Sequence, residues 1–337
     1  MEASKLSGTW ADPKFGRATI GEAADIWLGT VRPILKPKTI ASYESLLRSR
    51  VLPAFGQTRI VGLRPSDVQT WLATMQGDGL SPSRIRQAHV VLSSILESAV
   101  RDSRVARNVA RGARLPRIER REAPYFEPGT VDAIISSVPA QYAAFMAVQG
   151  VLGLRFGEAA ALRRSSVNLL RRRVRVTESL AEIGGELSFG STKSHAQRAV
   201  PLPPSVVETL TTHLADHAPP GASALLFTSS RGLPIRYSRF RPSVWLPVLE
   251  KLNLPGVGMH VLRHSAAARM IASGWSAKAV QQILGHGSAA FTLTVYGHLF
   301  DDDLDALANA LDGSFGGPPA DSLRTVGGAR DMHTYRP

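Results

Sequence analysis

The chain has 337 residues, 44% of them hydrophobic, which indicates roughly two folded domains with cores of their own. It contains no cysteine, so disulfides and thiolate zinc sites are excluded. No apolar run reaches the roughly 18 residues that cross a bilayer, and the N-terminal residues lack the apolar segment of a signal peptide. We therefore expect a cytoplasmic protein without a membrane partner.

Positive charge is concentrated in the first third of the chain. The formal net charge is +13, and residues 1–121 carry 20 Lys and Arg against 10 Asp and Glu, whereas residues 122–337 carry 20 against 17. Such a balance favours a polyanionic partner such as nucleic acid, with a merely basic protein as the alternative. The asymmetry indicates a DNA-binding module joined to a module whose positive and negative charges are more nearly balanced, and hence a nucleoid-associated protein.

Four helices are predicted within residues 19–106, and their apolar faces indicate a small helical domain. The first begins at Thr19, a favourable N-cap, and the second follows Pro37 and ends before Pro53. The third lies in RPSDVQTWLATMQGDG, where apolar residues recur at i, i+3, i+4 and i+7. The fourth and longest begins at Ser81, with a proline in its first turn.

Residues 107–124 are predicted to be a linker. They hold six arginines, two prolines and one glycine, and they have no amphipathic period. An extended basic segment of this kind is suited to lie along a phosphate backbone, although a solvated tether explains any single arginine equally well.

From residue 125 the pattern mixes helices with strands, and we expect one domain over residues 125–312. Alternating segments predict strands in residues 171–180, 186–194 and 197–203. Helices are predicted near residues 128–137, 139–152, from Gly157, and near 203–216, 236–252, 260–273, 276–284, 288–298 and 301–311. The expected fold class is mainly α with a small antiparallel β-sheet, an α+β chain. Residues 1–18 form an N-terminal tail, and the Gly- and Pro-rich residues 313–337 are predicted to be disordered.

Five short polar motifs stand out in the second domain. They are GLRFGE with Arg155 and Glu158, STKS with Lys193, HVLRH with His260, Arg263 and His264, LGH with His286, and TVYGH with Tyr296 and His298. Each motif alone has a structural explanation that is at least as good, such as an ion pair, a solvated lysine or a capping histidine.

The motif HVLRH also raises the question of a metal site. Two histidines four residues apart share one face of a helix, a common spacing for zinc. However, Arg263 lies between them, stays charged in any protein and repels a cation. No third ligand stands at a suggestive spacing, which argues against a metal and leaves either an anion site or two ordinary histidines at a buried helix start.

Taken together and in this order, the five motifs resemble the tyrosine recombinases, the phage-integrase type of site-specific DNA recombinase. The resemblance covers about residues 125–311 directly, and the basic helical domain before them is similar to that family's core-binding domain. It implies a helical core-binding domain followed by a tyrosine-recombinase catalytic domain. Many phage integrases also carry an N-terminal domain that binds arm-type DNA sites. Only residues 1–18 precede the first helix here, so we expect a short form without that domain, which either works without arm sites or has lost its N-terminus.

The resemblance implies that the substrate is a DNA phosphodiester and that no metal or other cofactor is needed. Tyr296 would attack phosphorus and form a covalent 3′-phosphotyrosyl bond, releasing a 5′-hydroxyl. The guanidinium groups of Arg155 and Arg263 would bind the non-bridging oxygens, on which negative charge grows in the transition state.

The resemblance also assigns roles to the remaining polar residues of the motifs. Lys193 would protonate the leaving 5′-oxygen, His260 would take up the tyrosine proton, and His286 would donate a hydrogen bond to the phosphate. Three further residues are expected to have supporting roles, namely Glu158, His264 and His298.

Several partners are expected from the same resemblance. Recombination needs double-stranded DNA and four protomers, and a narrow apolar stripe after the tyrosine, in residues 301–311, fits docking on a neighbouring protomer or packing within its own domain. An excision factor or a host DNA-bending factor is a possible further partner. Four basic residues of the first domain are candidate DNA contacts, with a solvated surface as the equal alternative: Lys36, Lys38, Arg84 and Arg86.

The function that the sequence favours is integration or excision of a phage, prophage or mobile element. One alternative within the family is a chromosome-dimer resolvase. A second is a DNA-binding prophage remnant that no longer cuts, although all six expected catalytic positions are filled. A third, a zinc hydrolase, predicts that a chelator abolishes activity.

Overall fold

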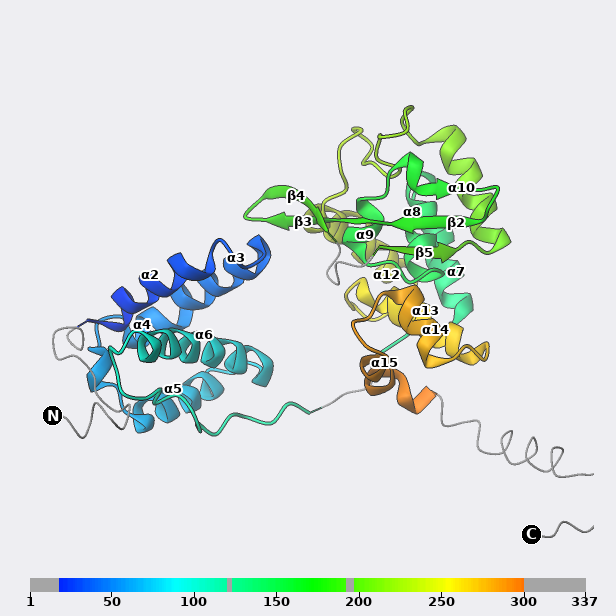
Figure 1. Cartoon of the computed structure of the whole chain (residues 1–337). Coiled ribbons are helices and arrows are strands. Elements are labelled where there is room, and N and C mark those ends of the chain that lie inside the picture. Colours follow the sequence, from blue (N-terminus) through cyan, green and yellow to red (C-terminus); the bar gives the residue numbers. More distant parts are fainter. Residues whose placement is uncertain (1–17, 120–122, 192–196, 300–337) are drawn as a thin grey trace, which may run out of the picture. The chain divides into compact units, whose positions relative to one another are not determined.

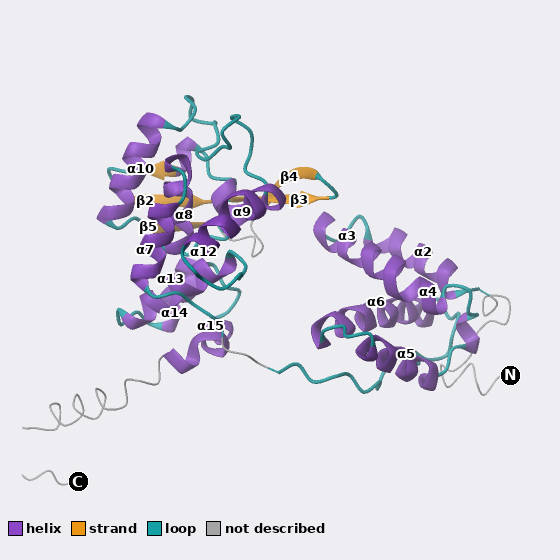
Figure 2. Ribbon diagram, turned by 180° about the vertical axis from the view of Figure 1, so that it is seen from behind, coloured by secondary structure: helices purple, strands orange, loops and turns teal. Residues whose placement is uncertain are grey.

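The computed structural model describes residues 18–119, 123–191 and 197–299, which contribute to two compact units. The first unit comprises residues 1–121 together with 178–191, and the second comprises residues 122–177 and 192–337. Helices dominate, with short antiparallel strands (Figure 1 and Figure 2), so the predicted fold class is confirmed. No described helix is long and apolar enough to cross a membrane.

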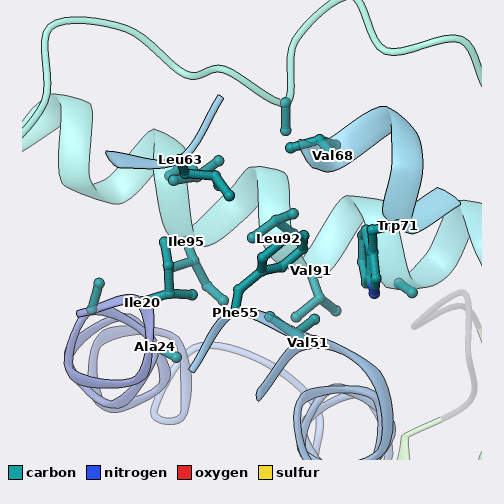
Figure 3. Packing of buried hydrophobic residues seen from close by; sticks show 14 of the residues in the cluster. Ile20, Ala24, Val51, Phe55, Leu63, Val68, Trp71, Val91, Leu92 and Ile95 are labelled. Atoms are coloured by element: carbon teal, nitrogen blue, oxygen red, sulfur yellow. The ribbon is translucent and has the colours of Figure 1, made fainter. Parts of the chain in front are cut away.

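The first unit is built from helices packed around one apolar core. Its elements are α2 (Ile20–Val31), α3 (Pro37–Leu46), the π-helix η2 (Leu47–Val51), α4 (Leu52–Phe55), the 3₁₀ turn η3 (Ile60–Gly62), α5 (Pro65–Gly77) and α6 (Pro82–Arg101). Thr19 caps α2, as predicted: its side chain accepts from the Glu22 amide, and the Glu22 carboxylate accepts from the Thr19 amide. Figure 3 shows Leu92 and Ile95 of α6 among apolar side chains of the surrounding helices.

The second predicted helix does not end before Pro53. The chain stays helical through residues 47–55, because the π-helix η2 comes directly before α4 and Pro53 lies in the first turn of α4. A proline removes one backbone donor, and widening the preceding turn accommodates that loss without ending the helix. The same arrangement occurs in the second unit, where the π-helix η5 (Arg241–Trp245) directly precedes α12 (Leu246–Lys251), a helix that also has a proline in its first turn.

Part of the predicted linker packs on the first unit. Ala110 is fully buried in the core of the helical unit, and its carbonyl lies 2.9 Å from Nε2 of His89. Asn108 donates to the Ser93 carbonyl, and the Pro116 carbonyl accepts from Nε of Arg86 at 2.9 Å. The chain up to Pro116 is therefore held against α6, with turns at residues 109–112.

Two strands form a separate hairpin that groups with the first unit. Strand β3 (Glu178–Ile183) pairs in antiparallel fashion with β4 (Glu186–Ser191), with Leu180 opposite Phe189. The predicted continuation of this second strand to Lys193 lies outside the described residues.

The second unit combines a three-stranded antiparallel sheet with helices. Its helical elements are α7 (Pro128–Ser137), α8 (Ala140–Gly150), α9 (Phe156–Ala160), η4 (Arg164–Ser166), α10 (Pro204–Asp216), α11 (Tyr237–Phe240), η5, α12, α13 (His260–Ala272), α14 (Ala277–Leu284), α15 (Ala289–Tyr296) and η6 (Gly297–Leu299). The strands β1 (Val167–Asn168), β2 (Arg173–Val176) and β5 (Arg198–Pro201) lie in the order β1-β2-β5. Buried Val174 pairs with buried Val200, which fixes the register of β2 and β5.

The end of the second unit is where the motif residues gather. Figure 1 shows α13 and α14 next to each other, with α15 against them, and the same grouping is seen from behind in Figure 2. A buried apolar cluster joins the three helices: Ala267, Ile271, Val280, Leu284 and the ring of Tyr296. This cluster sets the position of the tyrosine relative to HVLRH.

Candidate active site

Arg155 stands at the start of α9, where a tight turn brings it to the site. Gly153 has a φ of +73°, a conformation that favours glycine, and a Cβ there would collide with Leu284. The amide of Arg155 donates to Glu158 Oε2 at 3.0 Å, and its guanidinium donates to Glu158 Oε1 at 2.9 Å. The motif GLRFGE therefore turns the chain and holds the Arg155 guanidinium, whose side chain is 26% exposed.

Glu158 is a buried carboxylate between two guanidinium groups. Besides Arg155, it accepts from Arg198 of β5, with distances of 3.1 Å to Oε1 and 2.7 Å to Oε2. Burial alone would raise the pKa of Glu158, but the hydrogen bonds and charge of Arg198 and the charge of Arg155 outweigh it and lower the pKa to about 2. Glu158 is thus ionised at neutral pH and acts as the anchor for both arginines.

Arg263 is a buried cation that points into the same region from α13. Its side chain donates to the Gly153 carbonyl and to the Leu284 carbonyl, both at 2.7 Å, and the residue is 2% exposed. Burial, followed by the charge of Arg155, lowers the pKa of Arg263 to about 9. The guanidinium therefore remains charged at pH 7 without a carboxylate bound directly to it.

Three guanidinium groups converge on the end of α14. The consecutive carbonyls of Ile283, Leu284 and Gly285 accept hydrogen bonds from Arg198, Arg263 and Arg155, at 2.6, 2.7 and 3.4 Å respectively. The C-terminal carbonyls of a helix carry partial negative charge, which these cations satisfy. The motif LGH is thereby fixed to the arginines.

The two histidines of HVLRH lie on one face of α13. Their ring centroids are 4.9 Å apart and the rings are perpendicular. His264 is half-buried and its Nδ1 lies 2.7 Å from the hydroxyl oxygen of Tyr296, whereas His260 lies at the solvent side. Partial desolvation and the nearby charges of His264 and Arg263 lower the pKa of His260 to about 4.

His286 follows the left-handed Gly285 and is buried. Its Nδ1 lies 2.9 Å from Oγ1 of Thr292, a fully buried residue of α15. The side-chain amide of Gln281 donates to the backbone carbonyl of His286. Burial, followed by the charge of Arg263 and then of Arg155, lowers the pKa of His286 to about 3. The ring is therefore neutral at physiological pH and can donate one hydrogen bond from a fixed orientation.

Tyr296 ends α15, the helix that Ser288 caps. The residue is 3% exposed, and its ring lies parallel to that of His286 with centroids 6.4 Å apart. Burial raises the pKa of Tyr296 to about 12, and the charges of Arg263 and Arg155 act in the opposite direction. The phenol is protonated at rest and needs an acceptor for its proton before it can act as a nucleophile.

The arrangement is suited to an anion. Among the described residues of the site, three guanidinium groups stand against the single carboxylate of Glu158. Arg155 retains exposed surface, and each guanidinium has five donors, not all of which are used. The site therefore combines an excess of positive charge with a phenol and neutral imidazoles.

Most of the motif residues predicted from the sequence meet in this one place. Electrostatic and ring contacts connect seven of them: Arg155, Glu158, His260, Arg263, His264, His286 and Tyr296. Lys193 and the side chain of His298 lie outside the described residues, as does the predicted helix 301–311. The candidate DNA contacts Lys36, Lys38, Arg84 and Arg86 belong to the first unit, where Arg84 and Arg86 donate to Gln87 and Pro116.

Two residues of the site, Arg198 and Thr292, were not expected from the sequence. Arg198 and Val200 share one face of β5, and a charged residue on the buried face of a strand is a signal that could have been noticed. Thr292 lies four residues before Tyr296 and therefore on the same helical face.

The histidines of the site show no arrangement typical of a metal centre. Within the described ranges, no group of three or more His, Asp or Glu side chains is placed to hold a metal ion. Nδ1 of His264 is occupied by the tyrosine hydroxyl, and Nδ1 of His286 by a threonine.

Known proteins with similar sequences are phage integrases and tyrosine recombinases. Residues 129–302 match the model of the phage integrase family, and residues 19–76 match the phage integrase N-terminal SAM-like domain. A prophage phiRv2 integrase of Mycobacterium tuberculosis is 29% identical over 286 residues, covering 82% of this chain and 73% of that protein. Tyrosine recombinase XerC of Methylobacterium sp. (strain 4-46) is 27% identical over 301 residues, covering 82% and 89%.

Solved structures share the fold. The Tn1549 transposon integrase in complex with a circular intermediate DNA superposes with a TM-score of 0.75 at 21% sequence identity, covering 87% of this chain and 99% of that one. The family model spans more than half of the chain and includes all the motif residues of the site. The chain therefore belongs to the phage integrase family, the tyrosine-type site-specific recombinases.

Proposed function

We propose that the protein cuts and rejoins double-stranded DNA at specific sites through a covalent bond between Tyr296 and a 3′-phosphate. The observation that carries the proposal is the convergence of Arg155, Arg198 and Arg263 beside a buried tyrosine hydroxyl that is hydrogen-bonded to a histidine. Three guanidinium groups against one carboxylate leave an excess of positive charge beside a phenol nucleophile, which fits a phosphodiester and its more negative transition state.

Arg155 and Arg263 would bind the non-bridging oxygens of the scissile phosphate. Both are held rigidly, by Glu158 and by main-chain carbonyls, so their remaining N–H groups are preorganised for the anion. His286, which Thr292 orients, would donate a further hydrogen bond to the same phosphate.

Proton transfer completes the cleavage step. Lys193 would protonate the leaving 5′-oxygen, and a histidine of HVLRH would take up the phenolic proton of Tyr296. The covalent bond retains the energy of the phosphodiester, so a 5′-hydroxyl can attack it and restore a DNA strand. No metal or other cofactor enters these steps.

The biological role that we propose is integration or excision of a phage, prophage or mobile element, in a cytoplasmic, nucleoid-associated protein. The names of the relatives support this role, and the long match with a XerC recombinase favours chromosome-dimer resolution as the second candidate. In either role, strand exchange would use a tetramer on two duplexes, with an excision or DNA-bending factor as a possible accessory.

Covalent capture tests the proposal. The protein is incubated with duplex fragments from its own genomic neighbourhood in the presence of a chelator, and protease-sensitive protein–DNA adducts are sought beside a Tyr296→Phe control. We expect adducts that form without metal and vanish in the variant, and sequencing the trapped DNA then names the site. Tight binding without any adduct would instead point to a DNA-binding protein that no longer cuts.

A further inference from the structure

The hydroxyl group of Tyr296 has a hydrogen-bond partner inside the second unit. Its oxygen lies 2.7 Å from Nδ1 of His264, and the ring centroids of the two residues are 5.7 Å apart. This oxygen must lose its proton as it attacks phosphorus, so the group that holds it is the first candidate to receive that proton. The resemblance assigned this task to His260 instead.

Packing fixes the tyrosine against His264. His264, Ala267 and Ile271 recur at i, i+3 and i+7 on α13, and the last two belong to the apolar cluster that encloses the ring of Tyr296. The hydroxyl group is therefore directed to His264 by the same helix face that buries the ring. A contact made by two buried or half-buried side chains on packed helices is preorganised rather than accidental.

His260 occupies a different place. It lies one helical turn earlier, at the solvent side, and its ring contacts the ring of His264 edge-to-face rather than the tyrosine. Its position fits contact with incoming DNA or support of the His264 ring. Within the part of the chain that the structure describes, the hydrogen bond of the nucleophilic oxygen thus goes to His264.

The electrostatic surroundings keep His264 able to accept a proton. Burial, and then the charge of Arg263, lower the pKa of His264, so the ring is neutral at pH 7 and one nitrogen is an acceptor. An anionic phosphate beside the arginines would offset their charge and raise the pKa of the imidazole when DNA is bound. The charged and titratable groups of this cluster are His260 and Arg263 on α13, Arg155 and Glu158 at α9, Arg198 on β5, His286 after α14 and Tyr296 on α15.

We propose that His264 is the general base that receives the phenolic proton of Tyr296 during DNA cleavage. The inference rests on the proposed function, because it assigns one step of that reaction. As the bond between the Tyr296 oxygen and phosphorus forms and the bond between phosphorus and the 5′-oxygen breaks, the proton moves to Nδ1 of His264. The leaving 5′-oxygen takes its proton from the acid, the role proposed for Lys193.

The reverse step follows from the same contact. When a 5′-hydroxyl attacks the phosphotyrosine, the imidazolium of His264 returns its proton to the departing tyrosine oxygen. One residue therefore serves as base in cleavage and as acid in rejoining, as microscopic reversibility requires.

The test compares His264→Asn with the matched variant His260→Asn, one turn away on the same helix. The amide of asparagine keeps a hydrogen-bonding atom near the position of Nδ1 but cannot take up a proton. Single-turnover cleavage of the duplex recovered by covalent capture is measured from pH 5 to 9, beside DNA affinity and melting temperature. A second duplex carries a 5′-bridging phosphorothiolate, whose leaving group needs no acid.

We expect the wild-type rate to fall in acid as His264 becomes protonated. In His264→Asn, this decrease on the acid side of the pH–rate profile (the acid limb) should disappear. The variant should cleave both duplexes roughly 10²- to 10³-fold more slowly, with DNA affinity within about twofold of the wild type. His260→Asn should keep the limb even where its rate is lower. Should His264→Asn melt early, His264→Gln, which also lacks a titrating group, replaces it.

The opposite pattern would overturn the inference and leave the proposed function standing: an acid limb that persists in both His264 variants and disappears in His260→Asn. Recovery of the His264→Asn rate on the phosphorothiolate duplex would also overturn it, because that duplex relieves the need for an acid and not for a base. Failure of the wild-type protein to form any adduct would instead overturn the proposed function itself.

Discussion

Glu158 shows how much of this site depends on one buried carboxylate. It is 1% exposed and is bound by two guanidinium groups that come from α9 and β5. A buried carboxylate is tolerated only when such partners compensate its lost hydration. Removing the carboxylate would therefore release both Arg155 and Arg198 and leave their charges unpaired.

The lowered pKa of Glu158 predicts a specific dependence of stability on pH. Its folded-state pKa of about 2 lies below the ordinary value of 4.5, so the stabilisation is present above pH 4.5 and is lost as the pH falls through 2. The shift corresponds to about 3 kcal/mol in the free energy of unfolding. Urea titrations at pH 6.5 and 2.5 should show this loss in the wild-type protein.

A matched pair of variants separates this carboxylate from general acid effects. Glu158→Gln should be less stable at pH 6.5 and should lose less on acidification than the wild type. Glu208→Gln, which removes an exposed carboxylate of α10, should lose as much stability on acidification as the wild type. Equal acid losses in all three proteins would show that the Glu158 pair does not stabilise the fold in this way.

The turn between α14 and α15 carries the arginine contacts and His286, so a change there should affect catalysis. Gly285 has a φ of +68°, and a Cβ would lie 2.9 Å from a terminal nitrogen of Arg198. Gly285→Ala should therefore lower stability by roughly 1–3 kcal/mol and slow DNA cleavage, because both the backbone and the Arg198 guanidinium must shift.

Gly274→Ala is the control for this turn. Gly274 has a similar φ of +77°, but no atom lies within 4 Å of the added Cβ. It should show backbone strain alone, with cleavage close to the wild-type rate at a temperature where both variants are folded. Equal cleavage by the two variants would contradict the importance of the Arg198 contact.

Much of the element structure was accessible from the sequence, for reasons that are local. The cap at Thr19 and the apolar spacing around Trp71 act within a few residues, and the structure begins α2 directly after that cap and buries the apolar face of α5. Pro53 misled the prediction because a π-helix before it depends on packing with neighbouring helices rather than on local sequence. The strand β1 has two residues and gave no alternating pattern.

The site residues likewise divide into those that the sequence identifies and those whose role depends on tertiary packing. Five motifs identified residues whose chemical type points to phosphate chemistry, and the structure brings the described ones together. Arg198 was missed because its role depends on pairing with Glu158, 40 residues away in the sequence. The hydrogen bond between His264 and Tyr296 spans 32 residues and depends on how α15 packs against α13, which no spacing rule reveals.

At the scale of the whole molecule, the charge distribution predicts how DNA binding responds to salt. Residues 1–121, which form most of the first unit, hold 20 Lys and Arg against 10 Asp and Glu and so carry most of the net charge of +13. If that unit contacts six to ten phosphates, affinity should fall by roughly 10³- to 10⁵-fold between about 50 and 200 mM salt. Fluorescence anisotropy with a labelled duplex over this range measures the slope.

Two double lysine variants test which lysines contact the DNA phosphates. Replacing Lys36 and Lys38 with glutamine should reduce the magnitude of the slope of log affinity against log salt concentration by about two. Each phosphate contact releases about one counterion. Replacing Lys251 and Lys278, two exposed lysines of the second unit, changes net charge by the same amount and should alter the slope less. Equal changes in both double variants would show that overall charge, and not these lysines, sets the affinity.

Mapping the protein–DNA adduct shows whether Tyr296 forms the covalent bond to DNA. The trapped complex is digested with nuclease and protease, and the peptide that carries the nucleotide is identified by mass spectrometry. We expect a nucleotide on the phenolic oxygen of Tyr296. It should be lost in Tyr296→Phe and retained in Tyr237→Phe, which removes a hydroxyl from a 39% exposed tyrosine on α11. A nucleotide on any other side chain, or an adduct that survives Tyr296→Phe, would contradict this expectation.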